Sequence, residues 1–303
     1  MLTVDVERYV RLRQVLGFRL RDTSRELRAF AQFATAKGET HLREATAVAW
    51  ALAAPSPNAR YIRLQRVRHL ARFLRAEDPA HEVPSLSLFH YSKIRPLPYI
   101  YTPGEVGQIV KAAGRLRDTY ALRPHVYATL LGLIAATGLR VSEALDLQFD
   151  DVLRDGILRI RHTKFGKTRL LPLHPTVVAA LDRYLDVRRR VATSDDHVFL
   201  SASHRRISSR MVHYTFRRVL QLARIASTRT RPPRIHDLRH TFATRALERC
   251  SSGRETVARH VLALATYLGH ADIANTYWYL EATPELLRDV SAAAEALVAR
   301  EAP

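Results

Sequence analysis

Cysteine is almost absent from this sequence. The chain of 303 residues contains one, Cys250, which excludes an intrachain disulfide and any zinc site built from several cysteines. Long apolar runs are also missing, because the longest largely apolar stretch, Val126 to Ala136, has 11 residues and a membrane-spanning helix needs roughly 18–20. The first residues show no basic segment followed by an apolar one, so we expect no secretory signal. These absences predict a cytoplasmic protein.

Acidic residues are scarce as well. Aspartate and glutamate number 29 against 48 lysines and arginines, a net charge of +19. A surplus of this size indicates a polyanionic partner, and nucleic acid is the partner expected of a chain without a membrane segment. Hydrophobic residues make up 47% of the chain, which predicts folded domains, and the length is sufficient for two of them.

The N-terminal region has the pattern of a small helical domain. Apolar residues recur at helical spacing over 4–37, and a further helix is expected over about 58–76, with its stripe at Leu64, Val67, Ala71 and Leu74. Few acidic residues accompany the arginines of this helix, so we expect phosphate contacts, although a solvated face is the alternative. The expected DNA-binding residues here are Arg60, Arg63, Arg66, Arg68, Arg72 and Arg75.

Prolines indicate where this domain ends. Five of the fourteen lie between residues 77 and 103, and proline disrupts helices and stiffens extended chain. We therefore predict a helical DNA-binding domain over 1–78, a linker over 79–101 and a larger domain over 102–303. The larger domain opens at Thr102-Pro103-Gly104-Glu105, which has the pattern of a capping box at a helix start.

The larger domain is predicted to be mainly helical with a small antiparallel sheet. A buried helix is expected near 125–137. Asp155-Gly156 and Lys164 to Lys167 have the composition of the turns between three strands. The expected strands are Phe149 to Leu153, Ile157 to Arg161 and Arg169 to Leu173, and the further helices cover 175–192, 209–225, 237–250, 254–267 and 284–299.

Four short stretches contain side chains suited to chemistry. Arg140 follows a helix that ends at Gly138, and a guanidinium beside a buried helix needs an anion or a partner such as Glu143. A hairpin tip contains Lys164 and Lys167, which fit either a solvated turn or a proton donor above a bound backbone. The remaining stretches are His236-Asp237-Leu238-Arg239-His240 and Leu268-Gly269-His270 with Thr276-Tyr277-Trp278-Tyr279.

Each of the last two stretches has an alternative interpretation. His236 and His240 have the i,i+4 spacing of a zinc-binding pair, but no cluster supplies a third ligand, so we expect no metal. Gly269 fits a simple helix end with aromatic residues packed into a core. Taken together, however, the four stretches match phosphodiester transfer. Arginines can stabilise the charge on phosphorus, tyrosine can attack it, histidine can accept a proton and lysine can protonate the leaving oxygen.

This combination resembles the tyrosine recombinases, also called the phage integrase family. The resemblance covers about residues 5–285 and rests on the motifs Thr137 to Glu143, Thr163-Lys164 to Arg169 with Pro172, His236 to Thr244, and Leu268-Gly269-His270 with Tyr279. It implies a two-domain C-clamp around double-stranded DNA, built from a SAM-like helical core-binding domain and an α+β catalytic domain.

The resemblance also implies a role for each matching residue. Arg140 and Arg239 would hold the scissile phosphate, with a further hydrogen bond from His270. Lys164 would be the general acid and His236 the general base or a phosphate donor. Tyr279 would be the nucleophile, because the family places it nine residues after the histidine of Leu-Gly-His. Tyr277 competes with Tyr279, Lys167 competes with Lys164, and Lys167 and Arg169 are also expected to contact DNA.

The function implied is a site-specific recombinase or transposase that works through a 3′-phosphotyrosine without metal, ATP or another cofactor. The aromatic residues around Tyr279 resemble transposon-borne members, and 34 residues separate His236 from His270, more than is usual in the family. The tail over 284–303 would pack on its own domain or on a neighbouring protomer. The partners implied are DNA of a prokaryotic nucleoid, further copies of the chain, in a tetramer at synapsis, and sister recombinases. A type IB topoisomerase-like enzyme and a catalytically silent DNA-binding partner are the alternatives.

Overall fold

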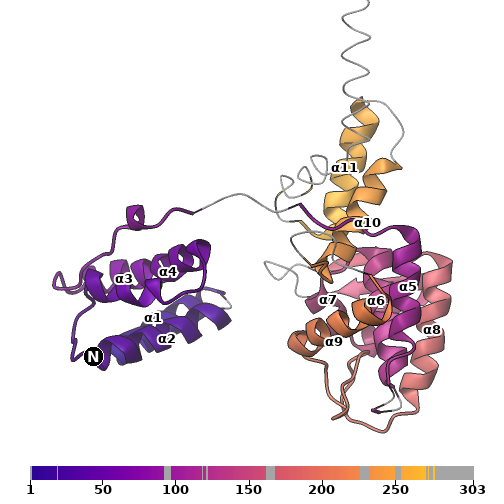
Figure 1. The fold of residues 1–303 in the computed structure, drawn as a ribbon, viewed down its shortest axis with the longest axis horizontal. Coiled ribbons are helices and arrows are strands. Elements are labelled where there is room, and N and C mark those ends of the chain that lie inside the picture. Colours follow the sequence, from indigo (N-terminus) through magenta and orange to yellow (C-terminus); the bar gives the residue numbers. More distant parts are fainter. Residues whose placement is uncertain are drawn as a thin grey trace, which may run out of the picture. The chain divides into compact units, whose positions relative to one another are not determined.

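The computed structural model describes residues 2–18, 20–91, 97–117, 119–120, 122–161, 168–225, 232–249, 254–270, 272 and 276. The chain forms two compact units, residues 1–96 and 97–303, and each is described by itself (Figure 1). The sequence-based boundaries at residues 78 and 102 stay predictions. Among the described residues, no helix combines the length and the apolar character needed to cross a membrane.

The first unit is a group of four helices (Figure 1). Its helices are α1 (Leu2–Val15), α2 (Arg21–Thr35), α3 (Glu44–Leu52) and α4 (Pro57–Arg75). The predicted stripe of α4 is confirmed, because all four of its apolar residues are buried in the core of this unit. Helix α3 is not predicted above. Its alanines occur at every second residue and so fall on two opposite sides of the helix, and the segment lacks the periodic pattern that identifies a helix with one buried face.

The start of the proline-rich segment is fixed to the first unit. Val83, Leu86 and Phe89 pack against its core. Leu86 begins the short 3₁₀ helix η1 (Leu86–Leu88), and Phe89 follows it. The carboxylate of Glu82 accepts a hydrogen bond of 2.7 Å from the backbone N–H of Glu44, at the start of α3. Residues 81–89 are therefore ordered by contacts with the helices rather than by proline stiffness alone.

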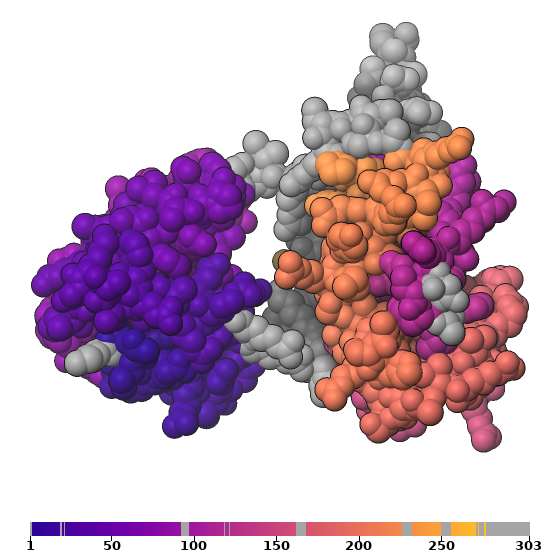
Figure 2. Space-filling model, turned by 60° about the horizontal axis from the view of Figure 1, so that its bottom comes forward, coloured from indigo at the N-terminus to yellow at the C-terminus, as the bar shows by residue number. Residues whose placement is uncertain are grey.

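The second unit is built around helix α6 (Arg123–Thr137), which contacts α5 (Pro103–Ala113), α8 (Pro175–Arg189) and α10 (His236–Glu248) (Figure 1). Helix α6 is the buried helix expected near 125–137, and these three helices pack around it. The other helices are α7 (Val141–Leu145), α9 (Ser209–Leu222) and α11 (Arg254–Leu268). Figure 2 shows in orange the α9–α10 part of the chain, which makes up much of one face of this unit.

The predicted antiparallel sheet is confirmed, with one correction. Strands β1 (Val152–Leu153), β2 (Ile157–Ile160) and β3 (Arg169–Pro172) pair in that order, and Asp155 and Gly156 take positive φ angles in the first turn. The expected strand over Phe149–Asp151 is wrong. Its residues form the 3₁₀ helix η2, because the Asp151 carboxylate accepts the N–H of Gln148 at 3.1 Å. A second 3₁₀ turn, η3 (Arg154–Gly156), joins β1 to β2.

Helix α5 begins with the predicted capping box, and the contribution of this cap to the stability of the protein can be measured. The Thr102 hydroxyl accepts the N–H of Glu105 at 3.2 Å, and the Glu105 carboxylate accepts the N–H of Thr102 at 2.7 Å. We expect Thr102→Ala to lower the free energy of unfolding by about 1 kcal/mol, because a helix donor loses its acceptor. Urea unfolding measures the change. Thr266→Ala, on the exposed face of α11, is the control, and an equal loss in both variants would contradict the capping argument.

Candidate active site

Arg239 is the centre of the candidate site. It lies in the first turn of α10 and is 2% exposed. Its guanidinium donates to the carbonyl of Gly138 after α6, to the carbonyl of Leu268 at 2.8 Å and to Nε2 of His270 at 3.0 Å. The side chain therefore joins the C-terminal ends of α6 and α11 to the start of α10.

The turn at Gly138 requires glycine for two reasons. Its φ of +64° lies in the left-handed region, as predicted for the end of this helix. A Cβ atom here would also lie 2.6 Å from Cδ1 of Phe242 and 2.8 Å from Cδ2 of Leu268. The absence of a side chain thus lets α6 end close to α10 and α11, with its carbonyl toward Arg239.

Arg140 follows this turn and is held from two sides. Its Nη1 donates to Glu143 at 2.6 Å, and its Nη2 donates to the carbonyl of Gly269 at 3.2 Å. The ion pair with Glu143 that the sequence left open is therefore present. It does not exclude binding of an anion, because 31% of the Arg140 side chain remains exposed. Both arginines therefore link the same two turns. Arg239 binds carbonyls of the 137–140 and 267–270 turns, and Arg140 belongs to the first turn and binds a carbonyl of the second.

Glu143 is shared by two arginines. Arg169, at the start of β3, donates from Nη1 and Nη2 to the two carboxylate oxygens at 3.1 and 2.9 Å, and from Nε to the carbonyl of Tyr267 at 2.9 Å. Although burial opposes ionisation, the hydrogen bonds and charges of Arg169 and Arg140 lower the pKa of Glu143 to about 2. The Arg169 side chain is only 12% exposed. This placement argues against the expected DNA contact of Arg169.

His236 and His240 lie one turn apart on α10. Their rings meet edge to face, with centroids 4.7 Å apart. His236 is exposed, whereas His240 is buried. Burial, followed by the neighbouring His236 ring, lowers the pKa of His240 to about 3. Although part of the His236 side chain is exposed, loss of solvation where the ring meets the protein, followed by the charge of Arg239, lowers the pKa of His236. Both rings are neutral at pH 7, and within the described ranges no group of three or more metal-ligating side chains occurs.

The contacts of His270 determine where its proton resides. Arg239 can only donate, so Nε2 of His270 accepts and the neutral ring carries its proton on Nδ1. Nδ1 lies 2.6 Å from the Thr276 hydroxyl, which therefore accepts this proton. Burial and the charge of Arg239 lower the pKa of His270 to about 4. The ring nitrogen that points at Arg239, Nε2, is thus a hydrogen-bond acceptor.

Four expected site residues are brought together, and others lie outside the described residues. Arg140, Arg239 and His270 are joined through the contacts given above, and His236 lies in the same first turn of α10 as Arg239. Lys164, Lys167, Tyr277, Tyr279 and the tail over 284–303 belong to the part of the chain that the structure does not describe. Their assigned roles stay predictions.

The arginines of α4 fall into two groups. Arg60, Arg63 and Arg68 donate to carbonyls of Ala54, Trp50 and Pro84, respectively. Arg66 pairs with Glu26, and Arg63 also stacks over the Trp50 ring. Arg72 and Arg75 are exposed. The predicted phosphate contacts of this helix thus rest most strongly on these last two residues.

Several supporting residues are not identified by the sequence reasoning. Asp237 is buried and accepts the N–H of Arg234 at 2.7 Å and its guanidinium at 2.9 Å, which fixes the start of α10. Thr241 accepts the N–H of Tyr101 at 2.9 Å. A signal existed for Asp237, since an acidic residue in the first turn of a helix is favoured there. None existed for Thr241, whose partner is 140 residues away.

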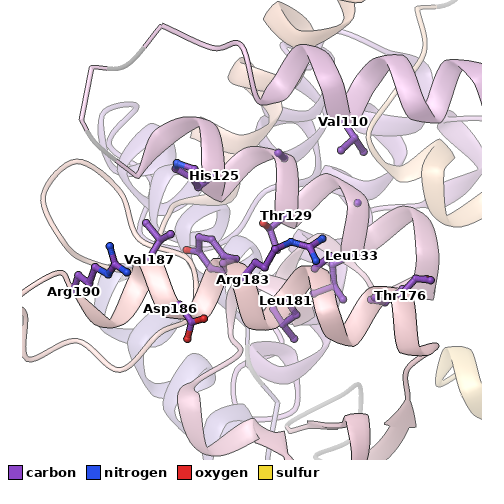
Figure 3. A pocket seen from close by; sticks show the side chains of 15 residues that line it. Val110, His125, Thr129, Leu133, Thr176, Leu181, Arg183, Asp186, Val187 and Arg190 are labelled. Carbon is purple, nitrogen blue, oxygen red and sulfur yellow. The ribbon is translucent and has the colours of Figure 1, made fainter.

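A groove on the second unit lies apart from this site. It has a volume of about 700 Å³ and runs between α6 and α8, lined mainly by apolar side chains such as Leu133 and Leu181 (Figure 3). Arg183, Asp186 and Arg190 lie along it (Figure 3). None of its lining residues belongs to the arginine–histidine cluster, so the groove is not the candidate active site.

The fold is similar to that of solved DNA recombinase structures. The solved structure of the XerH site-specific recombinase bound to a palindromic difH substrate matches 90% of this chain and 79% of its own, with a TM-score of 0.65 and 19% identity. The Tn1549 transposon integrase in complex with a circular intermediate DNA matches 98% of this chain and 100% of its own, with a TM-score of 0.65 and 17% identity. The fold is therefore that of the DNA recombinases and integrases.

Similarity in sequence identifies the family of this chain. The model of the phage integrase family matches residues 101–285. The integrase/recombinase-type protein y4rB of Sinorhizobium fredii is 36% identical over 294 residues, which are 94% of each chain. The tyrosine recombinase XerD of Brucella abortus is 31% identical over 278 residues, 87% of this chain and 86% of its own. The chain belongs to the phage integrase family and is a tyrosine recombinase.

Proposed function

We propose that this chain cuts and rejoins duplex DNA at specific sites through a covalent 3′-phosphotyrosine. One observation carries the proposal: two arginines and a histidine from three distant parts of the chain converge, with Arg239 3.0 Å from His270 and Arg140 on the carbonyl of the adjoining Gly269. Guanidinium groups fixed in this way are suited to the charge that develops on nonbridging phosphate oxygens.

The proposed roles follow from the chemistry of each group. Arg140 and Arg239 hold the scissile phosphate, and His236, neutral at pH 7, accepts the proton of the attacking hydroxyl. Tyr279 attacks phosphorus, the bond from phosphorus to the 5′ oxygen breaks, and Lys164 protonates that oxygen. Rejoining reverses these steps. Because the phosphotyrosine conserves the energy of the broken bond, no ATP is needed, and guanidinium groups supply the positive charge that other enzymes take from metal ions.

Partners follow from the charge and from the relatives. The net charge of +19 suits double-stranded DNA. One related structure is titled a lambda integrase tetramer bound to a Holliday junction, and by analogy this chain acts as an oligomer on DNA, a tetramer at synapsis. Its place would be the cytoplasm of a bacterial cell, at the nucleoid.

The test is a trap for the covalent intermediate. Wild-type protein is incubated with nicked duplexes from its native locus in the presence of a chelator, and the products are separated on denaturing gels. A protein–DNA adduct on the 3′ side of the cut is expected. Tight binding without any adduct would contradict the proposal, and relaxation of supercoiled DNA without strand exchange would indicate a topoisomerase instead.

His270 gives a pH dependence that can be predicted. To donate to a phosphate, Nε2 must carry a proton. We propose that the ring takes up this proton rather than changing tautomer, because a bound phosphate offsets the charge of Arg239 that opposes protonation in the free protein. The pKa of His270 is then about 4 in the free protein and higher with DNA, so the complex holds more protons and binding tightens as the pH falls. We expect up to about tenfold per pH unit between pH 7 and 5.5.

The measurement uses Tyr279→Phe protein, so that binding is not followed by cleavage. Dissociation constants are determined from pH 8 to 5.5 at constant salt. A second substitution, His270→Gln, should flatten the pH dependence, whereas His125→Gln, an exposed histidine on α6, should leave it unchanged. An equal slope with and without His270 would show that the proton is bound elsewhere.

A further inference from the structure

Arg169 is joined to the candidate site through Glu143 and the last turn of α11. All three of its donor groups are engaged: Nη1 and Nη2 with Glu143, and Nε with the carbonyl of Tyr267. Gly269 also lies against this guanidinium, because a Cβ added there would lie 2.6 Å from Nη1. The guanidinium is therefore enclosed between the α7 carboxylate and the turn that carries His270.

The sharing of Glu143 determines what Arg140 can do. One carboxylate oxygen accepts from the side chains of both arginines, at 2.6 Å from Arg140 and 3.1 Å from Arg169. The other accepts from Arg169 at 2.9 Å and from the backbone N–H of Arg140 at 3.1 Å. A carboxylate held by both arginines cannot turn to form a two-pronged pair with Arg140 alone, and Arg140 keeps donors for a phosphate.

A second contact ties the same strand to the same turn. The Tyr267 hydroxyl donates to the carbonyl of Pro172 at 3.4 Å, so both ends of β3 are bound to the last turn of α11. In the sequence, Lys164 shortly precedes β3 and Tyr279 shortly follows α11 and His270, so Arg169 joins the two elements that adjoin these residues.

We propose that Arg169 is a positioning residue for DNA cleavage, which orients Arg140 through Glu143 and fixes the 267–270 turn that carries His270. It acts through these groups and does not touch the DNA. The inference rests on the proposed function, and it replaces the DNA contact expected of this residue from the sequence.

The structure offers a matched control in the neighbouring strand. Arg159 on β2 donates to the buried carboxylate of Asp151 at 3.2 Å and to the carbonyl of Asp150. It is therefore also an arginine that binds a buried carboxylate and a main-chain carbonyl in the same sheet, but neither of these contacts reaches the site. Arg159→Lys removes the same kind of interaction as Arg169→Lys.

The experiment compares these variants in single-turnover cleavage of the nicked duplex, at protein concentrations that saturate the DNA. Lysine retains the charge but cannot span Glu143 and Tyr267 together. We expect Arg169→Lys to slow adduct formation about 10–100-fold, as displacement of a reacting group by about 1 Å does, with a dissociation constant for DNA within about threefold of wild type. Arg159→Lys should change neither quantity beyond about threefold.

Folding is controlled separately, because loss of one partner leaves a buried charge. The thermal unfolding midpoint is measured for every variant, and Arg169→Met combined with Glu143→Gln removes both charges if Arg169→Lys does not fold. That double variant should also bind DNA and cleave slowly. Cleavage at the wild-type rate by either folded variant would overturn the positioning role. Absence of an adduct with wild-type protein would instead count against the proposed function itself.

Discussion

In Tyr279→Phe protein we expect no covalent adduct with DNA, whereas Tyr277→Phe should form one at close to the wild-type rate. Phenylalanine retains the ring but lacks the oxygen that would attack phosphorus. Loss of the nucleophile removes the reaction rather than slowing it, so this is the largest effect predicted for the chain. Denaturing gels of the trapped nicked duplex measure it, and filter binding establishes that both variants still bind the DNA.

The reverse result would have a definite meaning. Tyr277 lies seven residues after His270, and on one unbroken helix this spacing would place the two residues on the same face. If the adduct is lost only in Tyr277→Phe, the enzyme class stands and the assignment of the nucleophile is wrong. If both variants form the adduct, another residue attacks phosphorus.

Arg239→Lys is expected to slow adduct formation about 10²–10³-fold, because removal of one preorganised donor to a developing oxyanion has an effect of this size. A lysine ammonium is a single point charge and cannot hold the Gly138 and Leu268 carbonyls while it also faces a phosphate. The measurement is the single-turnover rate at saturating protein, with the dissociation constant for DNA determined in parallel.

A second buried arginine supplies the control. Arg188 is also 2% exposed, and it donates to the carbonyls of Asp195 at 2.6 Å and His197 at 3.0 and 3.1 Å, away from the site. Arg188→Lys should lower stability by an amount similar to Arg239→Lys but leave the cleavage rate of the folded protein unchanged. Equal rates in both variants would show that Arg239 only supports the fold.

Local signals made much of the site predictable. Gly138 and the capping box at Thr102 depend on a few adjacent residues, and both have the predicted geometry. Arg140, His236, Arg239 and His270 were recognised because they occur in short motifs in a fixed order. That they converge could not be deduced from periodicity alone, since the contacts of Arg239 and Arg140 with the 267–270 turn span 29 to 129 residues.

Contacts that depend on tertiary structure were beyond the sequence. Arg169 was expected to contact DNA because a basic residue near a hairpin tip is usually exposed, yet Glu143 lies 26 residues earlier and the two meet only once β3 packs beside α7. The α4 arginines carry equal charges, but the adjoining α3 and Glu26 engage some of them. At residues 149–151, one bond from the Asp151 side chain to the backbone favoured a 3₁₀ turn over a strand.

The long reach of the Arg239 and Arg140 contacts has a consequence for synthesis. The acceptors of Arg239 lie 101 residues before it and 29 after it, and Arg140 binds a carbonyl 129 residues further along the chain. A ribosome releases these segments one after another, N-terminal first. A nascent or prematurely terminated chain without α11 therefore lacks two of the carbonyls that fix the guanidinium groups. Incomplete products of translation therefore cannot hold Arg140 and Arg239 in the arrangement described above.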